Sequence, residues 1–124
     1  MGNPVSPFRV DKYPSVEFLV VIDPSVGGGN GTSLDQDYMD ALPYLTENSN
    51  VIMVGYVDTN LATRNITDVT NEIESYGSLT GNLTFDGIFF DRTPTIFSND
   101  TLNYLNQIND FVRQYPGFGG TNFV

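Results

Sequence analysis

The chain has 124 residues, enough for one small domain and too few for two ordinary ones. Fifteen acidic residues against five scattered basic ones give a formal net charge of −10. This balance argues against nucleic acid and anionic membranes as partners, and it favours cationic ones such as amino sugars. The absence of cysteine and histidine excludes disulfides, a Ser-His triad and a typical zinc site within the chain. We expect no cofactor and no metal, although a carboxylate-only cation site stays open.

The first 15 residues hold three prolines and predict an irregular lead-in, followed by one domain over residues 16–124. Within that domain, three segments are mostly continuous runs of β-branched or aromatic residues. Such runs are typical of parallel strands that are covered on both faces. The three predicted strands are Val16 to Asp23, Val51 to Asp58 and Phe85 to Asp91.

Segments of helical period separate and follow these strands. The first, Asp35 to Leu45, contains Pro43, which we expect to kink or split the helix. The second runs from Thr67 to Tyr76 with Thr67 as its cap, and the third from Asn99 to Arg113 with Asn99 or Asp100 as its cap. The apolar faces of the second and third helices are predicted to carry Val69, Ile73, Tyr76, Leu102, Leu105, Ile108 and Val112. The alternation of strands and helices predicts right-handed βαβ units.

The spacing of the units indicates a larger array. Asp23, Asp58 and Asp91 end the three strands 35 and 33 residues apart, and an incoming strand is expected at Thr121 to Val124. The predicted fold class is therefore α/β, with about three and a half βα units of a partial (β/α)8 TIM-type barrel. A complete barrel takes about 250 residues. Because a partial barrel has two unpaired edges, we expect either further residues or association between copies.

Four Asn-X-Ser/Thr sequons begin at Asn30, Asn65, Asn82 and Asn99. They favour a secreted, extracellular or cell-wall glycoprotein whose signal peptide lies outside the sequence given. The alternative is that the sequons only reflect polar loop composition.

Three blocks of sequence, in this order and spacing, resemble the signature blocks of the spherulin-4 family. They are FLVVIDPSVGGG (Phe18 to Gly29), VIMVGYVDTNLATR (Val51 to Arg64) and DGIFFDRTP (Asp86 to Pro94). The resemblance covers residues 18–115. It implies a (β/α)8 barrel that is secreted by fungi, slime moulds or bacteria. It also implies carbohydrate chemistry, since some members are endo-acting glycoside hydrolases on galactosamine-containing exopolysaccharide.

The resemblance also indicates where the site should lie. In the hydrolytic members the third block ends in Asp followed by Glu, and a later strand carries a further acidic residue. This sequence matches the first residue with Asp91 and has Arg92 at the second, while the later acid would lie beyond Val124. Whether the chain is an enzyme is therefore left open.

The strand-terminal aspartates can be read from barrel physics alone. Side chains at the carboxyl ends of barrel strands surround the active site, so Asp23, Asp58 and Asp91 should converge there. Carboxylates roughly 5 to 10 Å apart suit glycoside hydrolysis, and crowding would raise one pKa to create a general acid. The alternative is that these aspartates cap the loops that follow the strands.

Three further side chains are candidate sugar contacts. Arg92 should lower the pKa of Asp91 and suit hydroxyl binding or an ion pair, unless it points into solvent. Tyr56 should face the same side as Asp58, to meet a sugar face or to pack in the core. Arg64 could contact acidic groups at the rim or be a solvated loop charge.

Two functions follow from these observations. The first is a secreted, spherulin-4-like carbohydrate-active domain that acts on or binds galactosamine-containing polysaccharide, with catalysis doubtful because of Arg92. The second is a non-catalytic, self-associating extracellular structural glycoprotein.

Overall fold

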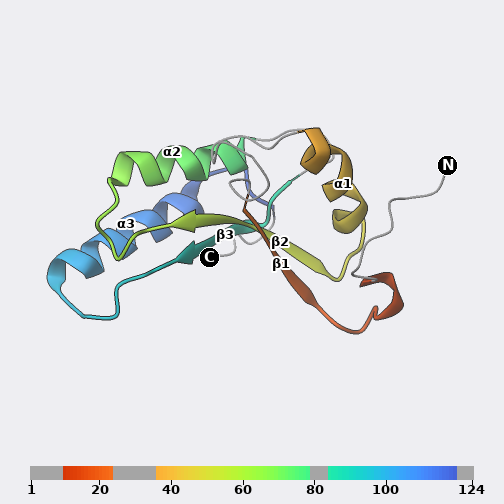
Figure 1. The fold of residues 1–124 in the computed structure, drawn as a ribbon, viewed down its shortest axis with the longest axis horizontal. Helices are drawn as coiled ribbons and strands as arrows, with labels where there is room; N and C mark the ends of the chain where they lie inside the picture. The colour runs from red at the N-terminus through yellow and green to blue at the C-terminus, as the bar shows by residue number, and fades with distance from the viewer. Residues whose placement is uncertain (1–9, 24–35, 79–83, 120–124) are drawn as a thin grey trace.

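The computed structural model describes residues 10–23, 36–78 and 84–119. The elements follow one another in the predicted order of strand and helix after a short 3-10 turn. They are η1 (Val10–Lys12), β1 (Phe18–Ile22), α1 (Gln36–Thr46), β2 (Val51–Asp58), α2 (Ile66–Gly77), β3 (Gly87–Asp91) and α3 (Asn99–Gln114). The strands form a parallel sheet in the order β1-β2-β3, so the α/β class is confirmed (Figure 1).

Strands β1 and β3 each begin two residues later than predicted, whereas β2 has the predicted bounds. The Val16 carbonyl accepts the side-chain amide of Asn50 at 3.0 Å. In front of β3, the carboxylate of Asp86 accepts the backbone N–H of Met53 at 2.9 Å. Side chains therefore form the hydrogen bonds of the Val16 carbonyl and the Met53 N–H. In a longer strand, backbone groups of the neighbouring strand would form them instead.

The helices correct three local expectations. Helix α1 runs through Pro43 without splitting, and the Pro43 carbonyl accepts the N–H of Glu47 at 3.0 Å. The N-cap of α2 is Asn65, whose side chain accepts the Thr67 N–H, so the prediction of Thr67 as the cap was wrong. Likewise Ser98 caps α3, in a capping box with Thr101. Sequence pattern alone could not choose among these neighbouring Asn, Ser and Thr residues.

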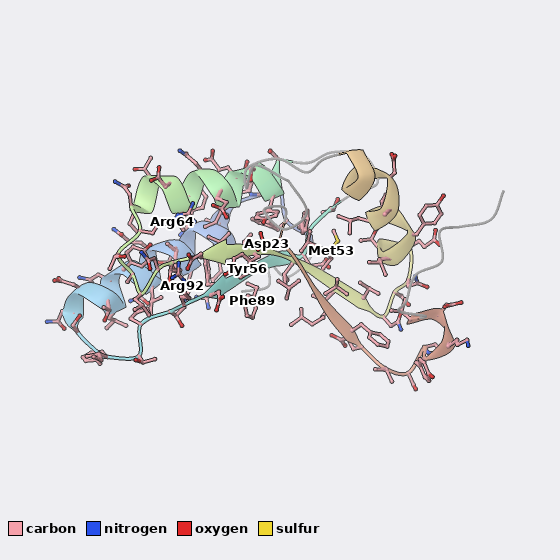
Figure 2. All side chains as sticks on the ribbon, viewed as in Figure 1. Asp23, Met53, Tyr56, Arg64, Phe89 and Arg92 are labelled. Carbon is pink, nitrogen blue, oxygen red and sulfur yellow. The ribbon has the colours of Figure 1, made fainter. Side chains whose placement is uncertain are left out.

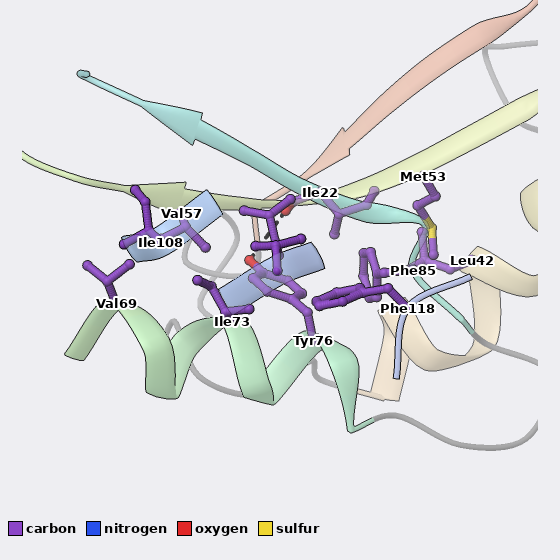
Figure 3. Packing of buried hydrophobic residues seen from close by; sticks show 12 residues of the cluster. Ile22, Leu42, Met53, Val57, Val69, Ile73, Tyr76, Phe85, Ile108 and Phe118 are labelled. Carbon is purple, nitrogen blue, oxygen red and sulfur yellow. Dashed lines mark hydrogen bonds between the residues drawn. The ribbon is translucent and has the colours of Figure 1, made fainter. Parts of the chain in front are cut away.

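The hydrophobic core lies between one face of the sheet and the helices (Figure 3). Met53 and Val57 of β2 and Ile88 of β3 point into it. The helices contribute Leu42, Val69, Ile73, Tyr76, Ile108 and Val112. Gly55 lets the Tyr76 ring lie against the sheet, because a Cβ there would come within 2.6 Å of that ring. The predicted faces of α2 and α3 are confirmed except for Leu102, which is exposed in the first turn of α3.

The opposite face of the sheet carries apolar side chains that stay half exposed among the described residues. In Figure 1 the helices all lie to one side of the strands. Leu19, Val21 and Phe89, which alternate with core residues, are 40 to 50% exposed on the other side. We call this the open sheet face. The strand expected at residues 121–124, which would extend the sheet, lies outside the described residues.

Candidate functional site

The carboxyl edge of the sheet gathers the three strand-terminal aspartates. Asp58 and Asp91 are direct partners in the parallel register of β2 and β3. Asp23 immediately follows β1, and Figure 2 shows it near Tyr56. The pKa of Tyr56 is raised mainly by its hydrogen bond to Asp91, and the charge of Asp23 makes the smallest contribution. The register therefore brings Asp58 and Asp91 together, and the approach of Asp23 to them stays a prediction.

Strained backbone frames this edge. Asn60, Leu61 and Ala62, which begin two residues after the end of β2, have φ of 47°, 58° and 65°, and Arg92, directly after β3, has φ of 49°. Each such residue costs about 1–2 kcal/mol, because its Cβ crowds the following carbonyl oxygen. Four of them at one edge need compensating bonds from their surroundings.

The buried Thr59 supplies part of that compensation. Its hydroxyl donates to the carbonyl of Arg92 at 2.8 Å, and the N–H of Leu61 donates to the same oxygen at 2.7 Å. The Thr59 N–H donates to the Asp91 carbonyl at 3.0 Å. The β2–β3 ladder thus continues into the two loops and holds both in one arrangement.

Arg92 forms a forked ion pair with Asp58, not with Asp91 as the sequence had suggested. Its Nε donates to Asp58 Oδ1 at 2.8 Å, and its Nη2 contacts Asp58 Oδ2. The left-handed conformation at Arg92 directs the side chain across to β2, which adjacency in sequence could not reveal. This guanidinium is the main cause that lowers the pKa of Asp58. The side chains are 55% and 26% exposed, so solvent weakens the pair and it contributes little stability.

Asp91 uses both carboxylate oxygens locally. Tyr56 donates its phenolic O–H to Oδ2 at 2.7 Å, and the backbone N–H of Arg92 donates to Oδ1 at 2.8 Å. The hydrogen bond to Asp91 is the main reason that the pKa of Tyr56 rises to about 12. Tyr56 and Asp58 share one face of β2, as their spacing predicts, and Tyr56 acts as a hydrogen-bond donor there.

An aromatic layer lies directly beneath these carboxylates. Tyr56 and Phe89 are register partners, and their rings stack with centroids 6.4 Å apart and planes 23° from parallel. Phe89 is 41% exposed on the open sheet face. Phe89 was not predicted as a site residue. Its position two residues before Asp91 in a strand was the available signal.

Arg64 joins the edge to the helices. Its guanidinium donates to the Asp58 carbonyl at 2.9 Å and to the Glu72 carboxylate of α2 at 2.5 Å. Its own carbonyl accepts the phenolic O–H of Tyr104 of α3 at 2.7 Å. Burial raises the pKa of Glu72, and Arg64 opposes this shift. The side chain of Arg64 thus fixes the turn after β2.

A hollow of about 330 Å³ lies at the opposite, amino edge of the sheet. It is lined by Thr46, Asn48, Ser49, Val51, Thr84, Asp86 and Gly119. Asp86 is its acidic residue, and one of its carboxylate oxygens accepts the N–H of Met53. In the described ranges, no group of three or more carboxylates could hold a metal ion, and no helix is long and apolar enough to cross a membrane.

The sequons fall on both described and undescribed residues. Asn65 and Asn99 are exposed at the starts of α2 and α3. Asn30, Asn82 and the Gly27–Gly29 loop lie outside the described residues.

Comparison with known proteins adds two findings. The model of spherulation-specific family 4 matches residues 7–124. Aspergillus clavatus Sph3, solved in complex with GalNAc, superposes with a TM-score of 0.86 at 38% identity. The match covers 93% of this chain and 47% of that one, so this chain spans about half the length of Sph3. No curated protein sequence matches the chain. The family match over most of its length shows that this chain belongs to spherulation-specific family 4.

Proposed function

We propose that the chain is a carbohydrate-binding portion of a (β/α)8 barrel. In this proposal the carboxyl edge holds a galactosamine-containing polysaccharide and does not hydrolyse it. The observation that carries the proposal is the cluster of Tyr56, Asp58, Asp91 and Arg92 on one edge. The similarity to Sph3, solved with GalNAc, supports the choice of sugar.

The chemistry of the cluster suits binding. Carboxylate oxygens accept sugar hydroxyls, while the guanidinium of Arg92 can donate to ring and hydroxyl oxygens. The aromatic layer of Tyr56 and Phe89 offers an apolar surface to a sugar ring. The net charge of −10 attracts a polymer with free amino groups.

Hydrolysis requires a carboxyl that can give a proton to the leaving oxygen. The pKa of Asp58 moves down, away from the range of a general acid, because Arg92 pairs with its ionised form. Both oxygens of Asp91 already accept hydrogen bonds, from Tyr56 and from the Arg92 backbone. The resemblance to the hydrolytic members implies Glu at the position of Arg92, and a guanidinium there cannot replace a carboxyl as the proton donor.

A binding titration with GalNAc, combined with a hydrolysis assay on galactosamine polysaccharide, tests the proposal. We expect the wild-type chain to bind GalNAc and to release no reducing ends. Asp91→Asn should weaken binding, because the amide has one acceptor oxygen where the carboxylate has two. The variant Arg92→Glu separates a decayed enzyme, which would regain hydrolysis, from a site used solely for binding. Wild-type protein that fails to bind GalNAc, or that hydrolyses the polymer, contradicts the proposal.

The open sheet face favours a second candidate function, a self-associating structural glycoprotein. Exposed Leu19, Val21 and Phe89 would be covered if two copies met across this face. In a complete barrel the same side chains would lie in the interior and be covered by further strands. A native mass of two or more 13.7 kDa units by light scattering supports this candidate, and a well-folded monomer contradicts it.

Secretion and glycosylation belong to both candidates as proposals. Asn65 and Asn99 are exposed, so a glycosyltransferase could reach them. Mass spectrometry of protein from a secreting eukaryotic host tests this, and peptides without glycan at all four sequons would contradict it.

A further inference from the structure

Two adjacent apolar side chains protrude from the loop between β3 and α3. Ile96 is 80% and Phe97 is 76% exposed, whereas most large apolar residues of the sheet and helices pack against the core. Exposing both costs solvation free energy that a polar pair would not, which suggests that the pair has a role in binding.

The loop presents this pair in a fixed position. Ser98 caps α3, and its capping box with Thr101 holds the backbone immediately after Phe97. The Thr101 hydroxyl also reaches the Ile96 carbonyl at 3.3 Å. A hydrophobic residue just before an N-cap often packs against the residue in the next turn, here Leu102. Such a contact would account for little of Phe97, because the side chain is 76% exposed and Leu102 is itself exposed.

The position of the loop links the pair to the carbohydrate site. The same loop begins at Asp91 and Arg92, and Figure 1 shows it leaving the carboxyl end of β3. Phe97 lies six positions after Asp91, so the Cα atoms of the two residues are at most about 20 Å apart. A separation up to this bound leaves room for a chain of several sugar units between the two residues.

We propose that Phe97, supported by Ile96, is a second carbohydrate contact, which receives a more distant unit of the polysaccharide held at Tyr56 and Asp91. This inference rests on the proposed function and names the contact that would make the site prefer a polymer. A flat aromatic ring covers the apolar face of one sugar and attracts an ammonium group through its π face. Two side chains are far too small for a stable protein interface, which takes about 800 Å² on each partner.

Titrations of the intact chain with two probes test the inference. The probes are GalNAc and a defined, partly N-acetylated galactosamine oligosaccharide of about eight units. We expect Phe97→Ala to leave GalNAc affinity unchanged and to weaken oligosaccharide binding about threefold to tenfold. The matched control is Tyr44→Ala, an exposed aromatic of α1 that leads into the amino end of β2, which should change neither affinity.

The outcomes distinguish this inference from the proposed function. Wild-type protein that binds no GalNAc contradicts the proposed function itself. Normal GalNAc binding with equal oligosaccharide affinity in wild type and Phe97→Ala overturns the role of Phe97 alone. A change in native mass on Phe97→Ala, with sugar binding unaltered, assigns the ring to a protein contact and also overturns the inference. Circular dichroism of each variant establishes that it is folded.

Discussion

At the residue scale, Asp58 and Asp91 at the carboxyl edge each accept a hydrogen bond from a different side chain. Arg92 donates to the carboxylate of Asp58, and Tyr56 donates to that of Asp91. The pairing keeps Asp58 ionised and Tyr56 protonated, as the lowered pKa of the first and the raised pKa of the second indicate. An edge built in this way presents fixed acceptors and a cation to a ligand.

The Tyr56 hydroxyl should make a pH-dependent contribution to stability. Because its pKa is about 12 in the folded chain, above the ordinary value of 10.0, this contribution is full below about pH 10 and falls as the pH rises through about 12. We expect Tyr56→Phe to lower the free energy of unfolding by roughly 1 kcal/mol near pH 8, with the difference from wild type shrinking above about pH 10. Urea denaturation at several pH values measures it.

Tyr44→Phe is the control for that measurement, since Tyr44 is an exposed tyrosine of α1. It should match wild type near pH 8. A Tyr56→Phe deficit that is absent near pH 8, or that stays constant up to pH 12, would contradict the assigned hydrogen bond.

At the scale of elements, the turn between β2 and α2 combines strain with dense hydrogen bonding. Three successive non-glycine residues are left-handed, and the bonds of Thr59 and Arg64 hold the turn in place. This geometry directs the Asn60 N–H to the Asp58 carboxylate at 2.9 Å. The turn therefore orients Asp58 from one side while Arg92 orients it from the other.

One substitution made at two places tests the strain. Ala62→Gly relieves a left-handed alanine, so it should leave the free energy of unfolding unchanged or raise it by up to about 1 kcal/mol. The same change at Ala41, exposed in helix α1, should lower it by about 1 kcal/mol. Thermal and urea unfolding compare the two. Equal destabilisation by both variants would show that the turn is not strained at Ala62.

The order of elements could be predicted from sequence because buried parallel strands and amphipathic helices leave distinct periods. Strand β2 even has its predicted bounds. The convergence of Asp58 and Asp91 followed from the topology, since parallel strands end at the same edge. The partner of Arg92 could not be predicted, because it depends on the left-handed backbone of Arg92. A left-handed residue is usually recognised in a sequence by a glycine, and this position has none. Phe89 was missed because its strand is a continuous apolar run, which predicts a strand covered on both faces. The described part of the chain covers only one face of that strand, and Phe89 lies on the other.

At the scale of the molecule, the sheet has one face packed against helices and one face open. The first holds the core and fixes the positions of the strand ends (Figure 3). The second carries the aromatic layer of Tyr56 and Phe89 and leads up to the carboxyl edge. If the chain is part of a barrel, as we propose, this face lines the interior and the edge becomes the floor of the binding site.

The location of GalNAc on the chain is the most direct test of this account. Two-dimensional NMR of isotope-labelled protein, titrated with the sugar, reports which backbone amides change. We expect shifts at Tyr56, Asp58, Asp91 and Arg92, at the carboxyl edge. Shifts confined to Asn48, Thr84 and Asp86 would place the sugar in the hollow at the amino edge, and no shifts would exclude binding. Either result would contradict the account.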